Sequence, residues 1–468
     1  MRLATIFAVT TLLTACAPTS NPSDPAQVSM NRPREAASGA PVALAAPVAS
    51  FAPVVAPSRA LRSNAEIAQD FVDLEFRMES GRPLPVFTRF EGPVTVALQG
   101  QVPPSAPQDL ARLVSRLRNE AGINISQTSG PASITVEFVP RRTIRTTYAN
   151  VACFVVPNVS SWAEFKAARG TGILDWASVR SRTKAAVFAP ADASPQEVRD
   201  CLHEEMAQAL GPLNDLYQLP DSVFNDDNFH TTLTGFDMLV LRAHYAPQLR
   251  SGMSQAQVAA VLPGVLAQMN PAGGAGRSHD GGRTPPAWVK SMEVALGAGG
   301  GAGAKRAAAE RALQIARAQG WSDGRLAFSH FAVGRLNIGQ DPVAAASAFA
   351  EASRIYRRLP GAHVQAAHVD MQLAALALSQ GRADQAVAFA DRAIPVVRRA
   401  ENASLLATLM MLKAEALELA GNDAAARAVR LDSQAWARYG FGSDAVARAR
   451  QRDISALAPS RLGLAIRG

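Results

Sequence analysis

Lysine and aromatic residues are scarce in this sequence. Five of the 47 basic residues are lysines, and Phe, Trp and Tyr together make up 6% of the chain. The net charge of +8 therefore comes almost wholly from arginine, which is spread along the chain without a basic stripe that alternates with aromatics. Nucleic-acid-binding domains carry such a basic surface, so we expect no nucleic acid partner. A length of 468 residues favours two folded units joined by linkers.

Long apolar runs are also missing. The longest near the start, residues 3–13, is too short to span a bilayer. It follows a positive start and precedes Leu-Thr-Ala-Cys, the layout of an export signal. Because it ends in Cys16, the segment 1–16 resembles the bacterial lipoprotein signal, which implies cleavage before Cys16 and a lipid on its thiol. Ala17 then favours the outer membrane, facing the periplasm. An ordinary secretory signal is the alternative.

The chain has three cysteines, which limits its disulfides. If Cys16 carries a lipid, Cys153 and Cys201 remain, enough for one bridge in an oxidising compartment. Cys153 lies in the strand-like run "VACFVVP", and Cys201 lies near the start of a helix. We predict a disulfide that joins this helix to a neighbouring strand. Two buried free cysteines are the alternative.

The composition divides the exported part into segments. Residues 17–63 are rich in Pro and Ala, which predicts a disordered tether. Residues 64–268 alternate strand and helix patterns, which predicts an α+β domain with a small mixed sheet. Its strands include a pair around Gly92-Pro93, and one helix begins at Ser194-Pro195 and closes at Gly211. Residues 269–304 are glycine-rich and predict a linker.

The last third of the chain repeats itself. Gly339, Gly381 and Gly421 are each followed by an amphipathic pattern, and small and large apolar residues recur about every 40 positions. This period predicts stacked helical hairpins over residues 305–440, followed by a basic tail over 441–468. "GRADQAVAFADRAI" resembles the second helix of a tetratricopeptide unit, which implies a protein or peptide partner in a concave groove. A helical cap that only packs on the first domain is the alternative.

The stretch "CLHEEMAQALGPLND" has the spacing of a zinc-protease helix but lacks its histidines. In the literal frame His203 starts the motif H-E-x-x-H, and the second ligand falls on Ala207, which cannot bind metal. In a frame shifted by one residue, Glu205 takes the place of the general base and Gly211 that of the sharp turn in the longer zincin signature. Asp215 follows the third ligand position. The ligand positions themselves then hold Glu204, Gln208 and Asn214.

Two downstream stretches extend the comparison. "SVFNDD" and "LTGFDMLVLRAHY" are similar to the turn and following helix of metzincins, with Phe224 at the position of the methionine beneath the metal. With "CLHEEMAQALGPLND", these stretches resemble a bacterial family known as domain of unknown function 2927 over residues 65 to 260. The family resemblance implies no established activity.

The altered ligand set predicts weak zinc binding. Glu204, Gln208 and Asn214 are oxygen donors, which suit hard divalent ions better than zinc, so we expect no cofactor, with a hard divalent metal as the alternative. We therefore expect a zincin-like cleft in a non-proteolytic binding or scaffolding lipoprotein. A divergent metallopeptidase with Glu205 as general base is the first alternative, and a repeat protein with a structural first domain is the second. The same polar residues could also only hold the helix in place, and His203, His230 and His244 are expected to be partly exposed without partners.

Overall fold

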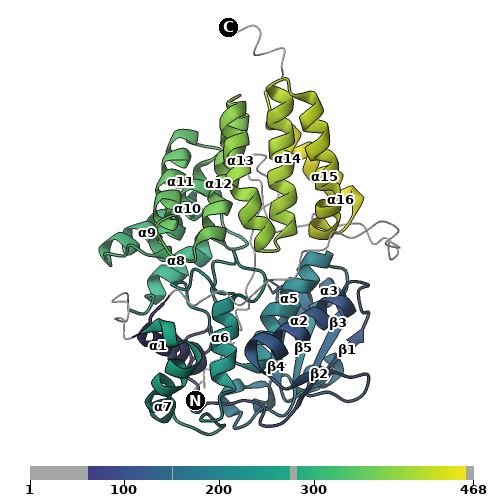
Figure 1. The fold of residues 1–468 in the computed structure, drawn as a ribbon, viewed down its shortest axis with the longest axis vertical. Coiled ribbons are helices and arrows are strands. Elements are labelled where there is room, and N and C mark those ends of the chain that lie inside the picture. The colour runs from purple at the N-terminus through teal and green to yellow at the C-terminus, as the bar shows by residue number, and fades with distance from the viewer. Residues whose placement is uncertain (1–61, 150, 275–281, 460–468) are drawn as a thin grey trace, which may run out of the picture.

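The computed structural model describes residues 62–149, 151–274 and 282–459. The predicted signal peptide, the lipidation of Cys16 and nearly all of the tether 17–63 lie outside the described residues, as do residues 460–468. Within the described ranges, an α+β half with a five-stranded mixed sheet is followed by a helical half (Figure 1). This arrangement confirms the predicted α+β region and the all-helical region after it. No helix in the described ranges is long and apolar enough to cross a membrane.

The sheet has the strand order β2-β1-β3-β5-β4. Strands β2, β1, β3 and β5 are parallel, whereas the edge strand β4 pairs antiparallel with β5. The central strands β3 and β5 are almost entirely buried, because helices and loops cover both faces of a parallel sheet. The strands are β1 (Val94–Gly100), β2 (Ile125–Gln127), β3 (Ile134–Val139), β4 (Phe154–Pro157) and β5 (Ala185–Pro190).

The predicted strand pair around Gly92-Pro93 is wrong in its first half. Strand β1 begins just after Pro93, but residues 86–92 form no strand. Their backbone bonds to a distant segment instead: the Phe87 amide donates to the Met253 carbonyl at 2.9 Å, and the Gly252 amide donates to the Phe87 carbonyl at 2.9 Å. The segment has the alternating apolar pattern of a strand, but its hydrogen-bond partners at residues 252 and 253 do not belong to the sheet.

Seven helices accompany the sheet in the described part of the first half. Helices α2 and α5 lie side by side against the sheet (Figure 1). The end of α2 is set by Gly122, whose left-handed φ of 70° ends the helix. The helices are α1 (Asn64–Glu75), α2 (Ala106–Ala121), α3 (Arg141–Thr147), α4 (Trp162–Ala168), α5 (Pro195–Leu210), α6 (Gly235–His244) and α7 (Gln255–Met269).

The second half is a stack of antiparallel helices. Gly339, Gly381 and Gly421 lie in the turns before α11, α13 and α15, so the helices follow these glycines as the 40-residue period predicts. The helices are α8 (Pro286–Leu296), α9 (Ala302–Ala318), α10 (Gly324–Asn337), α11 (Pro342–Tyr356), α12 (His363–Ser379), α13 (Ala383–Arg399), α14 (Ala403–Leu419), α15 (Asp423–Phe441) and α16 (Asp444–Ser455).

Two predicted boundaries need correction. The expected linker 269–304 contains helix α8, whose Trp288 is fully buried and donates its indole N–H to Ser329 at 3.0 Å. The expected tail 441–468 contains helix α16, whose Ile454 is fully buried in the helical core. Flanking glycines and arginines dominated the composition of these segments, but one well-placed apolar residue is enough to dock a short helix.

The two halves meet through a polar contact at the start of α5. The Gln196 amide donates to the Asn402 and Ser404 side chains at 3.1 and 3.2 Å, and its oxygen accepts the Ser404 backbone N–H at 2.7 Å. The buried Arg199 lies 5.6 Å from the ring centre of Tyr439 on α15. Buried and satisfied hydrogen bonds of this kind fix the orientation of two packed units.

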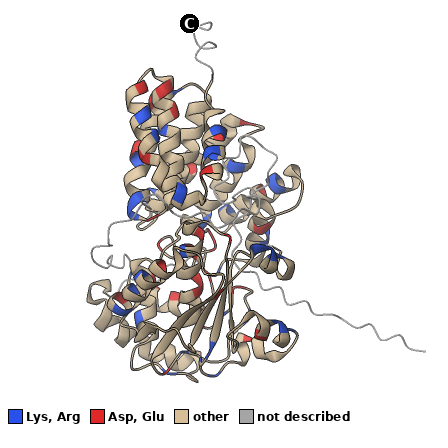
Figure 2. Ribbon diagram, turned by 90° about the vertical axis from the view of Figure 1, so that its right-hand side faces the viewer, with Lys and Arg blue, Asp and Glu red and all other residues tan. Residues whose placement is uncertain are grey.

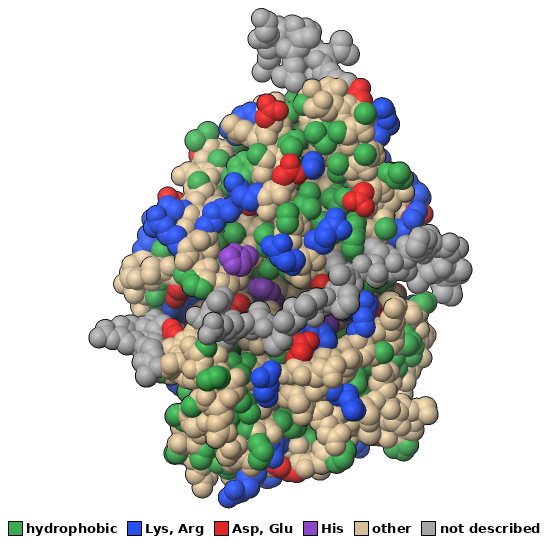
Figure 3. Space-filling view, in the orientation of Figure 1, with side chains coloured by type: hydrophobic (Ala, Val, Ile, Leu, Met, Phe, Trp, Pro, Cys, Tyr) green, Lys and Arg blue, Asp and Glu red, His purple; other side chains and the backbone are tan. Residues whose placement is uncertain are grey.

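A second contact is made by the loop before α6. Phe229 is buried, with its ring centre 5.2 Å from Phe331 and 4.4 Å from His368. The Gln365 amide donates to the Pro220 carbonyl at 2.7 Å. Basic and acidic residues are interleaved along the ribbon of both halves (Figure 2), and the face in Figure 3 likewise shows dispersed basic side chains. The halves are thus joined by specific buried contacts, not by opposite charged surfaces.

Neutral His368 at this contact should make stability depend on pH. Burial, followed by the nearby His230 and Arg335, lowers the pKa of His368 to about 3. Between about pH 7.5 and about pH 5 the wild type should lose about 2 kcal/mol of unfolding free energy relative to His368→Leu. The unfolded histidine takes up a proton below its ordinary pKa of about 6.5, whereas folded His368 does so only near pH 3. The stabilisation by neutral His368 is therefore complete above the pKa of the histidine in the unfolded chain, and it is lost as the pH falls below that pKa.

Urea unfolding at the two pH values measures this difference. Comparison with His368→Leu is needed because Asp227, whose pKa burial raises to about 7, acts in the opposite direction in both proteins. Equal pH dependence in wild type and variant would contradict the prediction.

Candidate functional site

A small pocket opens between helix α5 and the edge strand β4. Its volume is about 60 Å³, which is well below the roughly 300–1,000 Å³ of sites for drug-sized ligands. Its walls are mostly apolar and aromatic, with two carboxyl groups and one amide among them. The lining residues are Met78, Glu79, Ser80, Tyr148, Val151, Phe154, Val155, Trp176, Glu205, Gln208 and Leu213.

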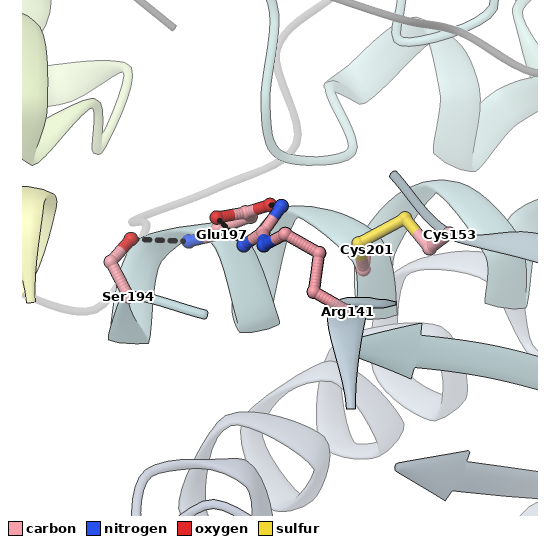
Figure 4. The surroundings of a disulfide bond; sticks show 5 residues. All are labelled: Arg141, Cys153, Ser194, Glu197 and Cys201. Carbon is pink, nitrogen blue, oxygen red and sulfur yellow. Dashed lines mark hydrogen bonds and ion pairs between the residues drawn. A yellow bond between two sulfur atoms is a disulfide. The ribbon is translucent and has the colours of Figure 1, made fainter. Parts of the chain in front are cut away.

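Helix α5 is fixed at its start and in its middle (Figure 4). The Ser194 hydroxyl accepts the Glu197 backbone N–H at 3.2 Å, as the predicted cap requires. Glu197 forms a bidentate pair with Arg141 at 2.6 and 2.7 Å. One turn later Cys201 forms a disulfide with Cys153, immediately before β4. This bond confirms the predicted disulfide, and it connects the two elements that form the pocket.

The end of α5 is held by a buried arginine. Arg182 donates to the carbonyls of Gln208 and Ala209 at 2.7 and 2.8 Å, and to that of Gly211 at 2.5 Å. These carbonyls have no partner within the helix. A Cβ on Gly211 would lie 3.0 Å from the Leu241 side chain, so glycine permits close packing of α6. The last turn of α5, which carries Gln208, is therefore rigidly placed.

Two carboxyl groups from distant segments meet in the pocket. The Gln208 amide donates to Glu79 Oε1 at 2.9 Å. Glu205 is 3% exposed, and its Oε2 has no hydrogen-bond partner. Burial, followed by the charges of Glu204 and Asp215, raises the pKa of Glu205 well above its usual range. Burial and nearby acids likewise raise the pKa of Glu79. The site thus places two carboxyl groups in a partly dry environment that favours their protonated, neutral form.

The three positions aligned with zinc ligands do not act together. Gln208 lines the pocket, but its amide is bonded to Glu79. The Asn214 amide instead donates to the backbone carbonyl of Asp73 at 2.8 Å, and Asn214 is not among the lining residues. Glu204 is half-buried and also lies outside the lining set. Glu205, aligned with the general base, does line the pocket.

The turn that carries Phe224 packs beside the segment that follows α5. The Leu216 amide donates to the Phe224 carbonyl at 2.9 Å, and the Phe224 ring is buried in the core. The turn itself is held by Asp237, which accepts the Ser222 hydroxyl at 2.5 Å and the Val223 amide at 3.1 Å. These hydrogen bonds join "SVF" to Asp237 of "LTGFD", so both stretches have a structural function at this turn.

The histidines near the motif are structural. His203 is buried and its Nδ1 accepts the Leu233 amide at 3.1 Å. His244 is fully buried and bonds to Glu75 at 2.7 Å. His230, which is partly exposed, contacts the Pro220 carbonyl at 3.0 Å. The expectation of histidines without partners is therefore wrong for all three.

The residues present do not fit a zinc ion. Zinc sites in proteins use three or four His, Cys or carboxylate ligands. Across the described ranges, no group of three or more His, Cys, Asp or Glu side chains is arranged to hold a metal ion. The hydrogen bond from Asn214 to the Asp73 carbonyl further separates one aligned position from the others.

Sequence reasoning missed much of the pocket. Glu79 and Trp176 lie far from the motif in the chain, and neither belongs to a recognisable pattern. Arg182 was also missed, because its carbonyl partners are defined only by the folded end of α5. The available signal was the zinc-protease spacing of "CLHEEMAQALGPLND", which pointed to Glu205 and Gln208.

Comparison with known proteins finds one family model that is similar to the first half of the chain. Residues 64–264 match the family model described as "Protein of unknown function (DUF2927)". The match covers the whole sheet and the helix with the pocket, and it confirms the predicted resemblance. No curated protein and no solved structure matches the chain.

Proposed function

We propose that this protein is a lipid-anchored binding protein of the cell envelope, with a zincin-like cleft that holds a peptide-like ligand without cleaving it. The observation that carries the proposal is the pocket beside α5, where Glu205 and Gln208 meet Glu79 among apolar walls. Mostly apolar pockets with a few convergent polar groups are typical ligand sites. The lipoprotein-like segment 1–16 and the tether 17–63 support the location.

The sheet and motif support the zincin-like reading. The pocket lies between an antiparallel edge strand and the helix that carries the degenerate signature. An edge strand offers backbone groups to which an extended peptide can pair. The position aligned with the general base reaches the pocket, whereas the aligned ligand positions do not converge there.

Metal analysis with one substitution tests the absence of cleavage. The soluble form that lacks residues 1–16, purified without chelator, should contain far less than one divalent ion per chain and should leave peptides intact. Near-stoichiometric metal and peptide cleavage that Glu205→Gln abolishes would instead establish a metallopeptidase. Glu310→Gln is the matched control, because it removes the same charge from an exposed position on α9.

The metallopeptidase remains the second candidate because of one observation. Buried Glu205 lines the pocket and its Oε2 has no hydrogen-bond partner, and a general base must lie within hydrogen-bond reach of its substrate. A base alone does not activate water as a metal-bound water is activated. The ligand positions therefore favour binding over hydrolysis.

The helical half extends the proposal to a partner. Its hairpins follow a period near 40 residues and resemble tetratricopeptide units, which supports a protein or peptide partner on their outer surface. One end of the helical half is already in contact with the first half, through Phe229 on one side and Gln365 on the other. The partner surface therefore lies away from this contact.

A further inference from the structure

We propose that the pocket takes the ammonium group of an alkylamine, such as a lysine-like side chain of a peptide, between Glu79 and Glu205. The inference rests on the proposed binding function and adds the chemical group that is recognised. It follows from the position of the two carboxyl groups, from the charges around them and from the shape of the walls.

The two carboxyl groups come to the pocket from different elements. Glu205 belongs to α5, whereas Glu79 belongs to the loop after α1, where its backbone N–H donates to the Leu213 carbonyl at 3.1 Å. Gln208, also on α5, donates to Glu79 at 2.9 Å. Glu205 Oε2 is left without a partner although the residue is 3% exposed. A buried carboxylate oxygen without a donor is costly, and an ammonium group supplies up to three donors.

Positive charge is missing from the pocket walls. None of the described lining residues is Lys, Arg or His. The guanidinium carbon of Arg182 lies 4.9 Å from the centre of the Trp176 ring. The guanidinium itself is not among the lining groups, and it donates its hydrogen bonds to the carbonyls at the end of α5. Burial is the main cause that raises the pKa values of Glu79 and Glu205, and the negative charges of Glu204, Asp215 and Asp226 raise them further. Such a site attracts a cation and repels an anion.

The walls favour an organic cation over a metal ion. Met78, Val151, Val155 and Leu213 form an apolar surface that can cover a methylene chain. Aromatic side chains lie beside it, and their faces attract ammonium groups. A volume of about 60 Å³ admits the end of a side chain but not a whole peptide. Divalent ions instead require several convergent oxygen ligands, and the described residues offer no such group of three.

Ligand-observed NMR titration with two small probes tests the inference. The full-length mature protein should bind n-pentylammonium roughly ten- to a hundredfold more tightly than n-pentanol, since a hydrogen bond to a charged group contributes that much. Glu205→Gln and Glu79→Gln keep the shape of each side chain and should each remove most of this preference. Glu310→Gln removes an exposed glutamate from α9 and should preserve the preference. Melting curves confirm that each variant is folded, and the use of two variants keeps the test valid if one is not.

The outcomes separate this inference from the proposed function. Equal binding of the amine and the alcohol, or binding of neither, overturns the ammonium site. So does a preference that survives in both glutamate variants. Peptides that bind equally well with lysine or norleucine overturn the inference but leave a binding protein. Metal-dependent cleavage overturns the proposed function, whatever the preference for amines.

Discussion

Loss of the Cys153–Cys201 disulfide is expected to lower the unfolding free energy by about 4 kcal/mol. The bond closes a loop with a sequence separation of 48 residues, and a cross-link of this length restricts the unfolded chain by about that amount. Both cysteines are buried, and alanine removes only the sulfur atom of each, so the double substitution leaves a small void and causes no clash. Urea unfolding of the soluble form, with and without the double substitution to alanine, measures the difference.

The single substitution Cys201→Ala is the control for the cross-link. If the cross-link is the cause, the single and double variants should lose nearly the same free energy, because either change opens the same loop. A loss below about 1 kcal/mol in the double variant would show that the bond adds little to the fold. The variants should also bind ligand more weakly, because the bond joins α5 to the segment before β4 and both line the pocket.

Phe229→Ala is expected to cost about 3–5 kcal/mol and to loosen the contact between the halves. The phenyl ring is 4% exposed and its centre lies 5.7 Å from that of Phe328 and 5.2 Å from that of Phe331. Truncation of a buried phenylalanine removes its apolar contacts and leaves a cavity, which together cost this much. Urea unfolding gives the free energy, and limited proteolysis detects exposure of residues 220–231.

Two controls sharpen this measurement. Phe229→Leu retains much of the apolar volume and should cost less than half as much. Phe389→Ala removes a partly exposed ring from α13 and should not expose the loop at 220–231 to protease. Unchanged protease resistance in Phe229→Ala would contradict the view that this side chain secures the contact.

Local signals in the sequence predicted the helices better than their partners. Ser194 and Gly122 act on neighbouring backbone, so the beginning of α5 and the end of α2 were readable from the chain. Helix α8 was missed because glycines on both sides obscured its short apolar face, on which Trp288, Met292 and Ala295 are buried. The segment 86–92 has a strand-like pattern but forms no strand, because its backbone bonds to residues 252 and 253, far along the chain.

The site was predictable only along its own helix. The spacing in α5 placed Glu205 and Gln208 on the wall that faces the pocket. The spacing could not reveal that Asn214 donates to the Asp73 carbonyl, because α1 approaches it only in the folded chain. Nor could it reveal Glu79, which enters from a loop more than 100 residues earlier. Partner choice among polar side chains is a tertiary property, and one sequence carries no direct record of it.

Helix α5 touches both halves of the molecule at different ends. Gln196 and Arg199 bond to the helical stack near its start, and Glu205 and Gln208 reach the pocket near its finish. Nine residues separate Gln196 from Glu205, about 13 Å along a helix axis. Because one continuous helix carries both sets of contacts, the position of this pocket wall is set relative to the helical stack as well as to the sheet.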